Sequence, residues 1–534
     1  MENSRQYLWW QSGVIYQVYP RSFQDSSNDG IGDIRGIIKR LDYLQWLGIN
    51  IIWLSPVYPS PMKDFGYDIT DYTAIHPLFG TMDDFDWLLQ ELHQRQMKLV
   101  IDLVPNHTSD EHPWFKESRS SEDNPKRNWY IWADATVDNK PPNNWLSVFG
   151  GSAWEWDEET QQYYYHAFLK EQPDLNYREP EVVKALGNIM KFWLDKGVDG
   201  FRIDVIWHLI KDKLLRNNPT NPDYRDYMPT YDSLLPVYST DQPEVHEIVS
   251  YMRSILDEYP ERMMIGEVYL PIHSLVTYYG INNNGAQLPF NFLLLQTPWD
   301  ALHISSMVDE YLSALPPKGW PNWVLGNHDQ PRIRSRVGSD QARVAAILLL
   351  TLPGTPTMYY GDEIGMQDVP IPLEEQHDPQ GLNMPEKNIS RDPERTPMQW
   401  DTSVYSGFSE ARPWLRVDKM ADIENVEVQK KGQWSMLLLY KKLIALRQKE
   451  WSLMAGNYDC IYHDRQGFVY TRKLEGHDSF LIALNLSHRQ CCFKLPEGIE
   501  GKVEVATIPE LENTMVANVI YLSGDEGIVV RLKA

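Results

Sequence analysis

Two charged residues interrupt a short apolar run in the middle of the chain, at Gly200–Trp207. The run reads GFRIDVIW, and its length and apolar content predict a buried strand. Arg202 and Asp204 are two positions apart, so both side chains lie on the same face of that strand. Burying a charge costs free energy unless the charge is paired or takes part in chemistry. The pair therefore indicates either a structural ion pair or part of a reactive site.

Further acids and histidines follow other apolar runs. His107 comes after KLVIDLV, Glu267 after MMIG, and His328 and Asp329 after WVLGN. If these runs are neighbouring parallel strands of a barrel, their carboxyl ends bring three carboxylates to one rim. Cleavage of a glycosidic bond with retention needs such a set, because an ionised nucleophile must face a protonated acid about 5–5.5 Å away.

The surroundings of each acid suggest its role. We expect Asp204 to be the nucleophile, because the neighbouring Arg202 lowers the pKa of a carboxylate. Glu267 has apolar neighbours, and dry surroundings would raise its pKa, as a general acid requires. Asp329 is the third acid, and it could accept hydrogen bonds from sugar hydroxyls that tighten in the transition state. The structural alternative is that these charges form ion pairs that only close a barrel.

Strand-like and helix-like segments alternate through most of the chain, which is typical of a parallel sheet. Eight strand candidates, mostly separated by helical segments, predict a closed (β/α)8 TIM barrel. They cover 14–19, 49–54, 98–104, 198–204, 263–268, 288–294, 323–326 and 355–360. The alternation breaks at 105–174, which is rich in Trp, Tyr, Pro and Asn, has no clear helix, and is too long for a simple connection.

This organisation predicts an α/β fold with three domains. The catalytic barrel takes residues 1–104 and 175–452, and an inserted subdomain takes 105–174 after the third strand. Short strands separated by polar turns predict a C-terminal antiparallel β-sandwich at 453–534.

Four pieces of the chain resemble, in their usual order, the signature segments of the α-amylase superfamily of retaining glycoside hydrolases. They read DLVPNH, GFRIDVIWH, GEV and LGNHDQPR. The segment QPDLN at 172–176 resembles one typical of the oligo-1,6-glucosidase and α-glucosidase branch, and YQVYPRSF and SRDPERTPMQW point to the same branch. The barrel, the insertion after the third strand and the sandwich match the three-domain plan of this superfamily.

The resemblance implies a role for each matching residue. Asp204 would be the nucleophile, Glu267 the acid/base and Asp329 the stabiliser of the transition state. Arg391 would pair with the aspartate that grips the terminal glucose, although Arg395 is close enough to compete. The residues implied to bind the sugar are Asp64, Tyr67, His107, Phe168, Arg202, His328 and Arg391. The alternative is that Tyr67 and Phe168 are ordinary core residues and that Arg391 forms only a structural salt bridge.

The loop DSSNDGIGD at 25–33 carries oxygen atoms at every second position, with a glycine at the sharp turn. This is the spacing of an EF-hand-like cation loop, although such a loop taken alone is more often a solvated turn. The resembled branch often binds a cation here. We expect a structural Ca²⁺ or Mg²⁺ at this loop and no cofactor for catalysis. The predicted ligands are Asp25, Ser27, Asp29, the carbonyl of Ile31, and Asp33.

Composition limits the partners of the protein. The net charge is −24, which argues against binding nucleic acid or an anionic membrane, because phosphate recognition needs clustered Lys and Arg. Three cysteines give no disulfide framework, the first residues do not read as a secretory signal, and the most apolar stretch, 345–352, is too short to span a bilayer. We therefore expect a cytoplasmic monomer or weak homo-oligomer that acts on a small oligosaccharide or α-glucoside.

Four functions are considered. The first is a retaining, exo-acting α-glucosidase that releases α-glucose from the non-reducing end of short α-1,4- or α-1,6-glucosides. The second is a transglycosylase or isomerase on the same scaffold, of the trehalose or isomaltulose synthase type. A non-catalytic relative is disfavoured because all three acids are kept, and an endo-amylase is disfavoured by the QPDLN segment. In the resembled branch a valine after the nucleophile, here Val205, accompanies α-1,6 activity, but the bond type stays open.

Overall fold

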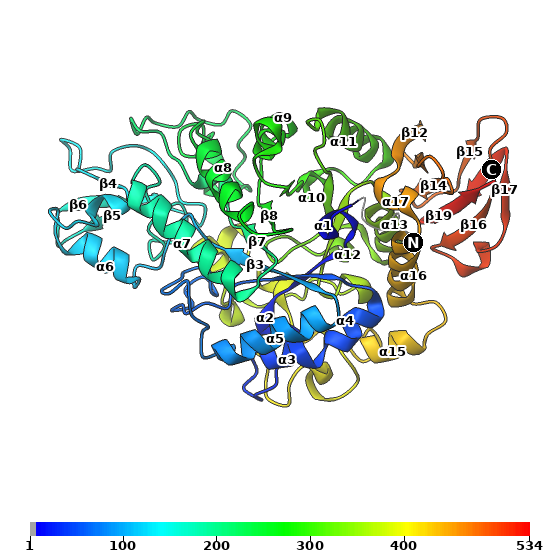
Figure 1. Cartoon of the computed structure of the whole chain (residues 1–534), viewed down its shortest axis with the longest axis horizontal. Helices are drawn as coiled ribbons and strands as arrows, with labels where there is room; N and C mark the ends of the chain where they lie inside the picture. The colour runs from blue at the N-terminus through cyan, green and yellow to red at the C-terminus, as the bar shows by residue number, and fades with distance from the viewer. Residues whose placement is uncertain (1–6, 534) are drawn as a thin grey trace.

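Eight parallel strands form the central sheet of the computed structural model, which describes residues 7–533 (Figure 1). In sheet order they are β10 (Asn322–Val324), β11 (Thr355–Tyr359), β1 (Ile15–Val18), β2 (Ile51–Leu54), β3 (Lys98–Leu103), β7 (Gly200–Ile203), β8 (Met263–Gly266) and β9 (Leu288–Pro289). Every residue of β2, which reads IIWL, is buried, as a strand covered on both faces requires. The predicted eight-stranded barrel is confirmed.

The barrel closes between β9 and β10 through side-chain contacts. The Nδ2 of Asn322 donates to the carbonyl of Pro289 at 2.5 Å, and the backbone N–H of Asn291 donates to the Oδ1 of Asn322 at 3.0 Å. The sequence predicted a strand through residue 294, but β9 ends at Pro289. The Oδ1 of Asn291 accepts the N–H of Leu293 at 3.1 Å, and this turn starts a short helix instead.

Helices cover the outside of the barrel (Figure 1). The longer ones are α3 (Ile34–Lys39), α4 (Leu41–Leu47), α5 (Met82–Gln94), α7 (Pro180–Lys196), α8 (Val245–Leu256), α11 (Ala301–Ala314), α13 (Ser339–Thr351) and α16 (Met436–Lys449). The shorter ones are α1 (Trp9–Ser12), α2 (Pro20–Phe23), α9 (Ile272–Leu275), α10 (Leu293–Gln296), α12 (Ile333–Val337), α14 (Pro379–Asn383), α15 (Val426–Lys431) and α17 (Trp451–Ala455). Local sequence fixes their ends: Thr81 and Asp84 form a capping box at the start of α5, and Gly197, with φ of +102°, ends α7.

The insertion after β3 folds into a small sheet with one helix. Its strands are β4 (Trp132–Ala133), β5 (Trp154–Asp157) and β6 (Gln162–Tyr165), in the order β4-β6-β5. The expectation that this segment has no helix is wrong, because α6 spans Pro113–Ser120. The side chain of His112 accepts the N–H of Trp114, and Pro113 occupies the first turn, where its missing N–H costs nothing.

The C-terminal strands form one antiparallel sheet in the order β12-β13-β14-β19-β16-β17-β18-β15. Their bounds are β12 (Asn457–His463), β13 (Gly467–Lys473), β14 (Phe480–Asn485), β15 (Cys491–Lys494), β16 (Glu500–Ala506), β17 (Met515–Ala517), β18 (Val519–Leu522) and β19 (Gly527–Leu532). The sheet folds over, so that Leu481 of β14 and Val530 of β19 share a core with Phe493 of β15 and Ile520 of β18. Strands β16 to β18 were not predicted, because β16 alternates polar with apolar residues and β17 and β18 are only three and four residues long.

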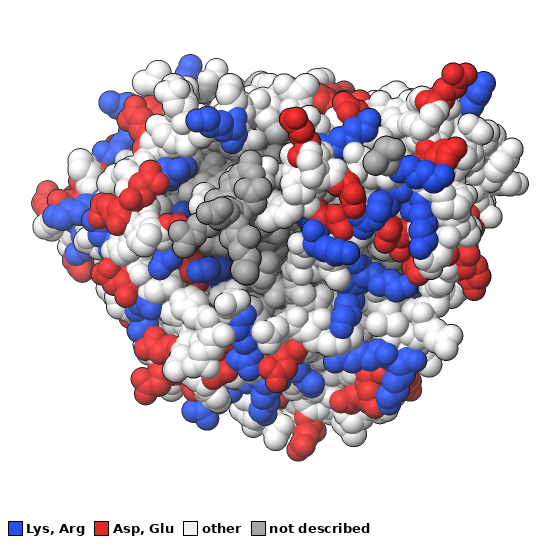
Figure 2. Space-filling model, turned by 45° about the vertical axis from the view of Figure 1, so that its right-hand side comes forward, with Lys and Arg blue, Asp and Glu red and all other residues white. Residues whose placement is uncertain are grey.

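Figure 2 shows Lys and Arg interspersed with Asp and Glu on the described part of the face in view. Among residues 7–533, no helix combines the length and the apolar character needed to cross a bilayer.

Candidate active site

Strand register brings the two central carboxylates together. On the β7–β8 ladder Ile203 pairs with Gly266, and the next residues of the two strands are Asp204 and Glu267. The N–H of Glu267 donates to the carbonyl of Ile203 at 3.0 Å, which continues the ladder past the strand ends. Because parallel strands end at the same rim of a barrel, both carboxylates lie at the carboxyl-terminal face.

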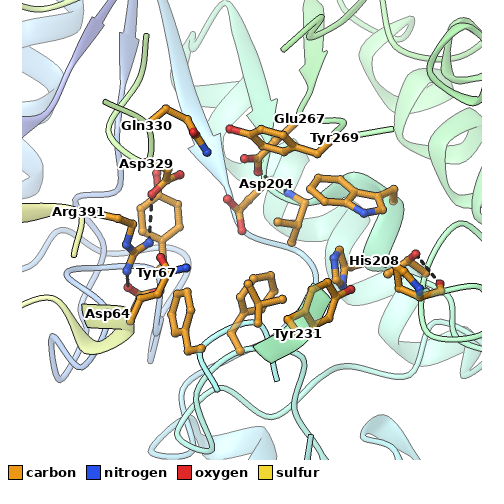
Figure 3. A pocket seen from close by; sticks show the side chains of 18 of the residues that line it. Asp64, Tyr67, Asp204, His208, Tyr231, Glu267, Tyr269, Asp329, Gln330 and Arg391 are labelled. Carbon is orange, nitrogen blue, oxygen red and sulfur yellow. Dashed lines mark hydrogen bonds and ion pairs between the residues drawn. The ribbon is translucent and has the colours of Figure 1, made fainter. Parts of the chain in front are cut away.

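These carboxylates line a cavity of about 460 Å³ (Figure 3). Of the residues predicted to catalyse or to bind sugar, all but Arg202 line this cavity. They are Asp64, Tyr67, His107, Phe168, Asp204, Glu267, His328, Asp329 and Arg391.

Arg202 lies below the cavity and contacts three carboxylates. Its Nη1 is 2.7 Å from an oxygen of Asp102 and 2.7 Å from an oxygen of Asp204, and its Nη2 is 2.8 Å from the Oε2 of Glu267. The side chain of Arg202 is fully buried. The two charges in the apolar run are therefore paired with each other, and Arg202 also contacts the second acid of the site.

A strained backbone position orients Glu267. Val205 has φ of 37°, in the left-handed region that a β-branched residue rarely adopts. In this conformation its N–H donates to the Oε2 of Glu267 at 2.8 Å. One oxygen of Glu267 is thus engaged by Val205 and Arg202, and neither contact involves its Oε1. Backbone strain of this kind persists only where the surrounding structure over-determines it.

The two central acids share their protonation. Burial and the neighbouring charge of Glu267 raise the pKa of Asp204 well above its ordinary value, and burial raises the pKa of Glu267. The sequence predicted that Arg202 would lower the pKa of Asp204. The contact is present, but burial and the second carboxylate outweigh it. Since two adjacent buried carboxylates do not both ionise readily, we infer that the pair holds one proton near neutral pH.

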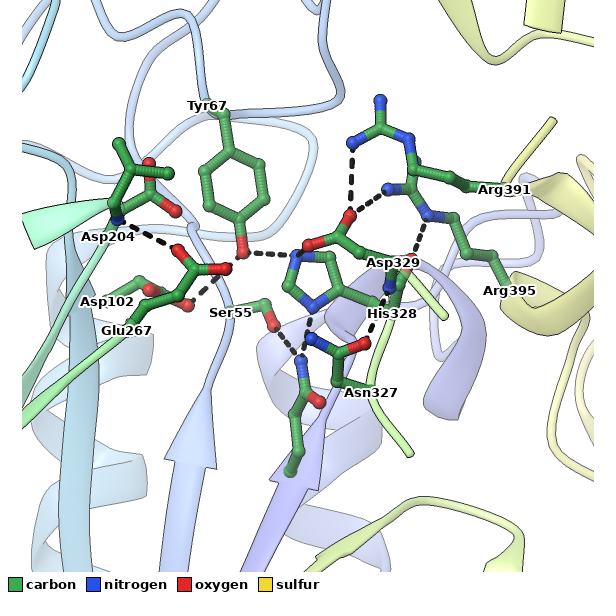
Figure 4. Close-up of polar contacts among 12 residues, drawn as sticks. Ser55, Tyr67, Asp102, Asp204, Glu267, Asn327, His328, Asp329, Arg391 and Arg395 are labelled. Atoms are coloured by element: carbon green, nitrogen blue, oxygen red, sulfur yellow. Dashed lines mark hydrogen bonds and ion pairs between the residues drawn. The ribbon is translucent and has the colours of Figure 1, made fainter. Parts of the chain in front are cut away.

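Asp329 is the acid that stays ionised. Burial alone would raise its pKa, but the charges of His328, Arg391 and Arg395 hold that pKa well below the ordinary value. Its Oδ1 accepts from Arg391 at 3.0 Å and from Arg395 at 2.9 Å (Figure 4). A fixed negative charge therefore lies in the cavity wall beside the proton-sharing pair.

One end of the cavity is closed by an aspartate and an arginine. The Nη2 of Arg391 donates to the Oδ1 of Asp64 at 2.8 Å, and Gln172 donates to the Oδ2 of Asp64 at 3.1 Å. Arg395, the competing candidate, contacts Asp329 instead. Asp378, which the sequence analysis missed, accepts from the Nε and the Nη2 of Arg391 at 2.9 and 2.6 Å. No catalytic motif points to Asp378, because it caps the short helix α14 and does not directly follow a barrel strand in the sequence.

Aromatic and histidine side chains complete this end. The hydroxyl of Tyr67 is 2.7 Å from the Nε2 of His328, and their rings are parallel within 4° (Figure 4). His107 lies 5.3 Å from Phe168 between ring centroids, and burial lowers the pKa of His107 to about 4. His107 is therefore neutral near pH 7, when it can both donate and accept hydrogen bonds.

The loop at 25–33 is closed by its own hydrogen bonds. The carboxylate of Asp25 accepts the N–H groups of Ser27, Asn28 and Gly30 at 2.8 Å and the hydroxyl of Ser409 at 2.6 Å. The carboxylate of Asp33 accepts from Ser26 and caps α3, and Asp29 is exposed. Among residues 7–533 no three acidic, histidine or cysteine side chains gather around one point as a metal requires. The cation at this loop, which would also use the hydroxyl of Ser27 and the carbonyl of Ile31, stays a prediction.

Comparison with known proteins identifies the family. The model of the α-amylase catalytic domain matches residues 17–456. This range includes the second half of β1 and the whole of every other barrel strand. The chain belongs to the α-amylase family of glycoside hydrolases.

Two relatives within this family cover most of the chain. An α-glucosidase of Apis mellifera is 42% identical over 488 residues, which is 89% of this chain and 85% of that protein. An oligo-1,6-glucosidase of Parageobacillus thermoglucosidasius is 41% identical over 536 residues, which is 93% of this chain and 94% of that protein.

A solved structure of the family has the same fold. The crystal structure of an α-glucosyl transfer enzyme, XgtA, superposes with a TM-score of 0.93 at 36% identity, over 99% of this chain and all of that one.

The loop at 25–33 gives a test of stability. Asp25→Ala leaves the buried N–H of Gly30, the buried hydroxyl of Ser409 and two part-buried N–H groups without this acceptor, so we expect a loss of about 3 kcal/mol in the free energy of unfolding and a lower Tm, measured in EDTA. Asp29→Ala, whose exposed carboxylate accepts only the N–H of Ile31, is the matched control and should change Tm little in EDTA.

Addition of Ca²⁺ to the EDTA-treated protein tests the predicted cation. The sequence predicts a rise in Tm for the wild type that is lost in Asp29→Ala. Equal Tm values with and without Ca²⁺ would contradict that prediction.

Proposed function

We propose that the protein is a retaining, exo-acting α-glucosidase that removes α-glucose from the non-reducing end of short α-glucosides. The observation that carries this proposal is the contact of one buried guanidinium, that of Arg202, with both Asp204 and Glu267. This arrangement supplies two adjacent carboxylates with one proton between them, which is what a double displacement at an anomeric carbon uses.

In the first step a carboxylate oxygen of Asp204 attacks the anomeric carbon of the terminal glucose. Glu267 gives its proton to the glycosidic oxygen, the bond between that oxygen and the anomeric carbon breaks, and a β-linked glucosyl ester of Asp204 forms. In the second step water attacks the same carbon, its proton returns to Glu267, and the ester bond breaks. Two inversions release glucose in the α configuration.

The ionised Asp329 supports both steps. Positive charge develops on the ring oxygen and the anomeric carbon in each transition state. A carboxylate held ionised by Arg391 and Arg395 offers acceptors to the sugar hydroxyls without taking up a proton itself. Such a fixed charge costs no reorganisation when the reaction occurs.

The closed end of the cavity supports exo action. The paired Asp64 and Arg391 line the cavity on one side of Asp204, and their polar atoms suit the hydroxyls of a terminal sugar. An endo-acting enzyme needs an open cleft through which the chain passes on both sides. We therefore propose that a single glucose residue binds between this pair and Asp204.

Transglycosylation is the second candidate, and the similarity to an α-glucosyl transfer enzyme favours it. The glucosyl ester is common to both reactions, and they differ in whether water or a sugar hydroxyl attacks it. The α-glucosidase and oligo-1,6-glucosidase relatives favour hydrolysis, of α-1,4 or α-1,6 bonds. Incubation with maltose, isomaltose, trehalose and sucrose, followed by identification of the products, distinguishes the two reactions and the preferred bond.

We also propose a reducing compartment, the cytoplasm, and a monomer or weak homo-oligomer. Cys460, Cys491 and Cys492 are all free thiols, and Cys492 is exposed, where an oxidising compartment would leave it open to reaction.

Removal of the proposed nucleophile tests the proposal. Asp204→Ala should lower kcat on p-nitrophenyl α-glucoside by about 10⁴-fold or more, because no carboxylate is left to form the ester. The wild-type enzyme should release glucose as the α anomer, which NMR can detect before the sugar mutarotates. The variant Asp226→Ala, which removes an exposed carboxylate, is the control. Near-normal turnover of Asp204→Ala, or release of β-glucose, would contradict the proposal.

The shared proton predicts a bell-shaped pH profile of kcat/KM for the wild type on p-nitrophenyl α-glucoside. Activity falls at low pH when Asp204 gains a proton, and at high pH when Glu267 loses its own. Because the pKa values of both groups are raised, both limbs should lie at higher pH than for a pair of exposed carboxylates.

Glu267→Gln separates the two limbs. Its amide resembles the protonated acid, so with α-glucosyl fluoride, whose leaving group needs no acid, the low-pH limb should stay where it is in the wild type. The high-pH limb should disappear. A high-pH limb that persists in Glu267→Gln would show that another group is responsible for it.

A further inference from the structure

The cavity has two halves, on either side of Asp204. Figure 3 shows Asp64 and Arg391 on one side of Asp204, and His208 and Tyr231 on the opposite side. On the proposed function the first half binds the terminal glucose. The second half must then receive the group that leaves with the glycosidic oxygen.

The wall of this second half is an irregular segment that follows the nucleophile, residues 230–240. Tyr231, Asp232, Pro236 and Thr240 all line the cavity. The segment is tied to the barrel near Asp204, because the N–H of Asp241 donates to the carbonyl of Trp207 at 2.8 Å.

Further hydrogen bonds fix the same segment. The N–H of Asp212 donates to the carbonyl of Tyr238 at 2.8 Å, and the Nδ2 of Asn218 donates to the Oγ of Ser239 at 3.0 Å. The wall is therefore built before any ligand binds, and its side chains are held at fixed positions.

Asp232 differs from the other acids of the cavity. Asp64, Asp204, Glu267 and Asp329 each contact an arginine. Within residues 7–533 the carboxylate of Asp232 has neither a hydrogen-bond donor nor a cationic partner, and only burial acts on its pKa, which it raises. Asp232 is half-buried in the cavity wall, so its carboxylate is free to accept hydrogen bonds from a ligand that displaces water from this half of the cavity.

We propose that Asp232 accepts hydrogen bonds from hydroxyl groups of the leaving-group sugar, and so selects leaving groups that are themselves sugars. This inference rests on the proposed function. Hydroxyls are the donors that a neutral sugar offers, and a hydrogen bond to a charged acceptor is worth more than one to a neutral acceptor. A leaving group without hydroxyls, such as fluoride, gains nothing from Asp232.

The same contact positions an acceptor sugar during transfer. In that reaction a hydroxyl oxygen of the acceptor bonds to the anomeric carbon of the glucosyl ester. The bond from that carbon to Asp204 breaks and its electron pair returns to the carboxylate, while the hydroxyl proton goes to Glu267. Asp232 touches the acceptor away from the reacting atoms, and it therefore raises the share of transfer over hydrolysis.

The test compares two substrates that share the glucosyl group and differ in the leaving group. The substrates are α-glucosyl fluoride and whichever of maltose and isomaltose the wild type cleaves faster. In Asp232→Ala the ratio of kcat/KM for the disaccharide to kcat/KM for the fluoride should fall about 10- to 100-fold, as expected for loss of a charged hydrogen bond. Asp232→Asn keeps the shape and one acceptor oxygen, and its ratio should be intermediate.

Asp223→Ala is the matched control, because Asp223 is an exposed acid of the same long connection and does not line the cavity. Its ratio should equal that of the wild type. If a variant folds less completely, the rates on both substrates fall by the same factor, so the ratio of the two kcat/KM values is unaffected. A wild-type ratio in both Asp232 variants would overturn the role of Asp232, whereas a wild-type protein inactive on the fluoride would instead contradict the proposed function.

A second measurement follows the acceptor. With α-glucosyl fluoride as donor and free glucose as acceptor, Asp232→Ala should yield less disaccharide per fluoride released than the wild type. An equal yield of disaccharide from the two proteins would overturn the proposal.

Discussion

The buried guanidinium of Arg202 is the contact on which the site depends. Three carboxylates, those of Asp102, Asp204 and Glu267, surround it beneath the cavity. Burying this many acids with one cation leaves an excess of negative charge, and the least costly way to reduce that excess is to bind a proton. The proton that the mechanism needs is thus a consequence of the charge balance, and its proposed donor is Glu267, whose Oε1 is contacted by neither Val205 nor Arg202.

Strand register explains why so much of this site is predictable from sequence. Asp102 pairs with Arg202 on the β3–β7 ladder, and Ile203 pairs with Gly266 on the β7–β8 ladder. Apolar runs mark the strands, and parallel pairing then sends the residues after each run to one rim. The barrel and the approximate position of Asp204, Glu267 and Asp329 follow from these local patterns, without knowledge of any long-range contact.

The parts that escaped prediction lie where the backbone is irregular. Asp378, which orients Arg391, caps the short helix α14, and Asp232 lies in a short helical turn of the cavity wall. Neither residue directly follows a barrel strand, so the strand pattern does not bring their side chains to the site. The raised pKa of Asp204 also escaped. The apolar run predicts burial and the spacing predicts the contact with Arg202, but neither shows that burial, together with the charge of Glu267, outweighs that contact.

The two irregular segments that wall the cavity also hold each other in place. Asn144 of the insertion exchanges hydrogen bonds with Asn218 of the long connection after β7, and the indole of Trp145 donates to the carbonyl of Arg216. Lys211 of that connection is buried against Asp174 at the end of the insertion. Because the two segments fix each other, the residues that they place in the cavity wall can change while Arg202 and the three carboxylates that it contacts stay the same. On the proposed roles, Arg202 and the carboxylates that it contacts set the charge balance while Asp232 of the wall selects the acceptor, so that one barrel could serve both hydrolysis and glucosyl transfer.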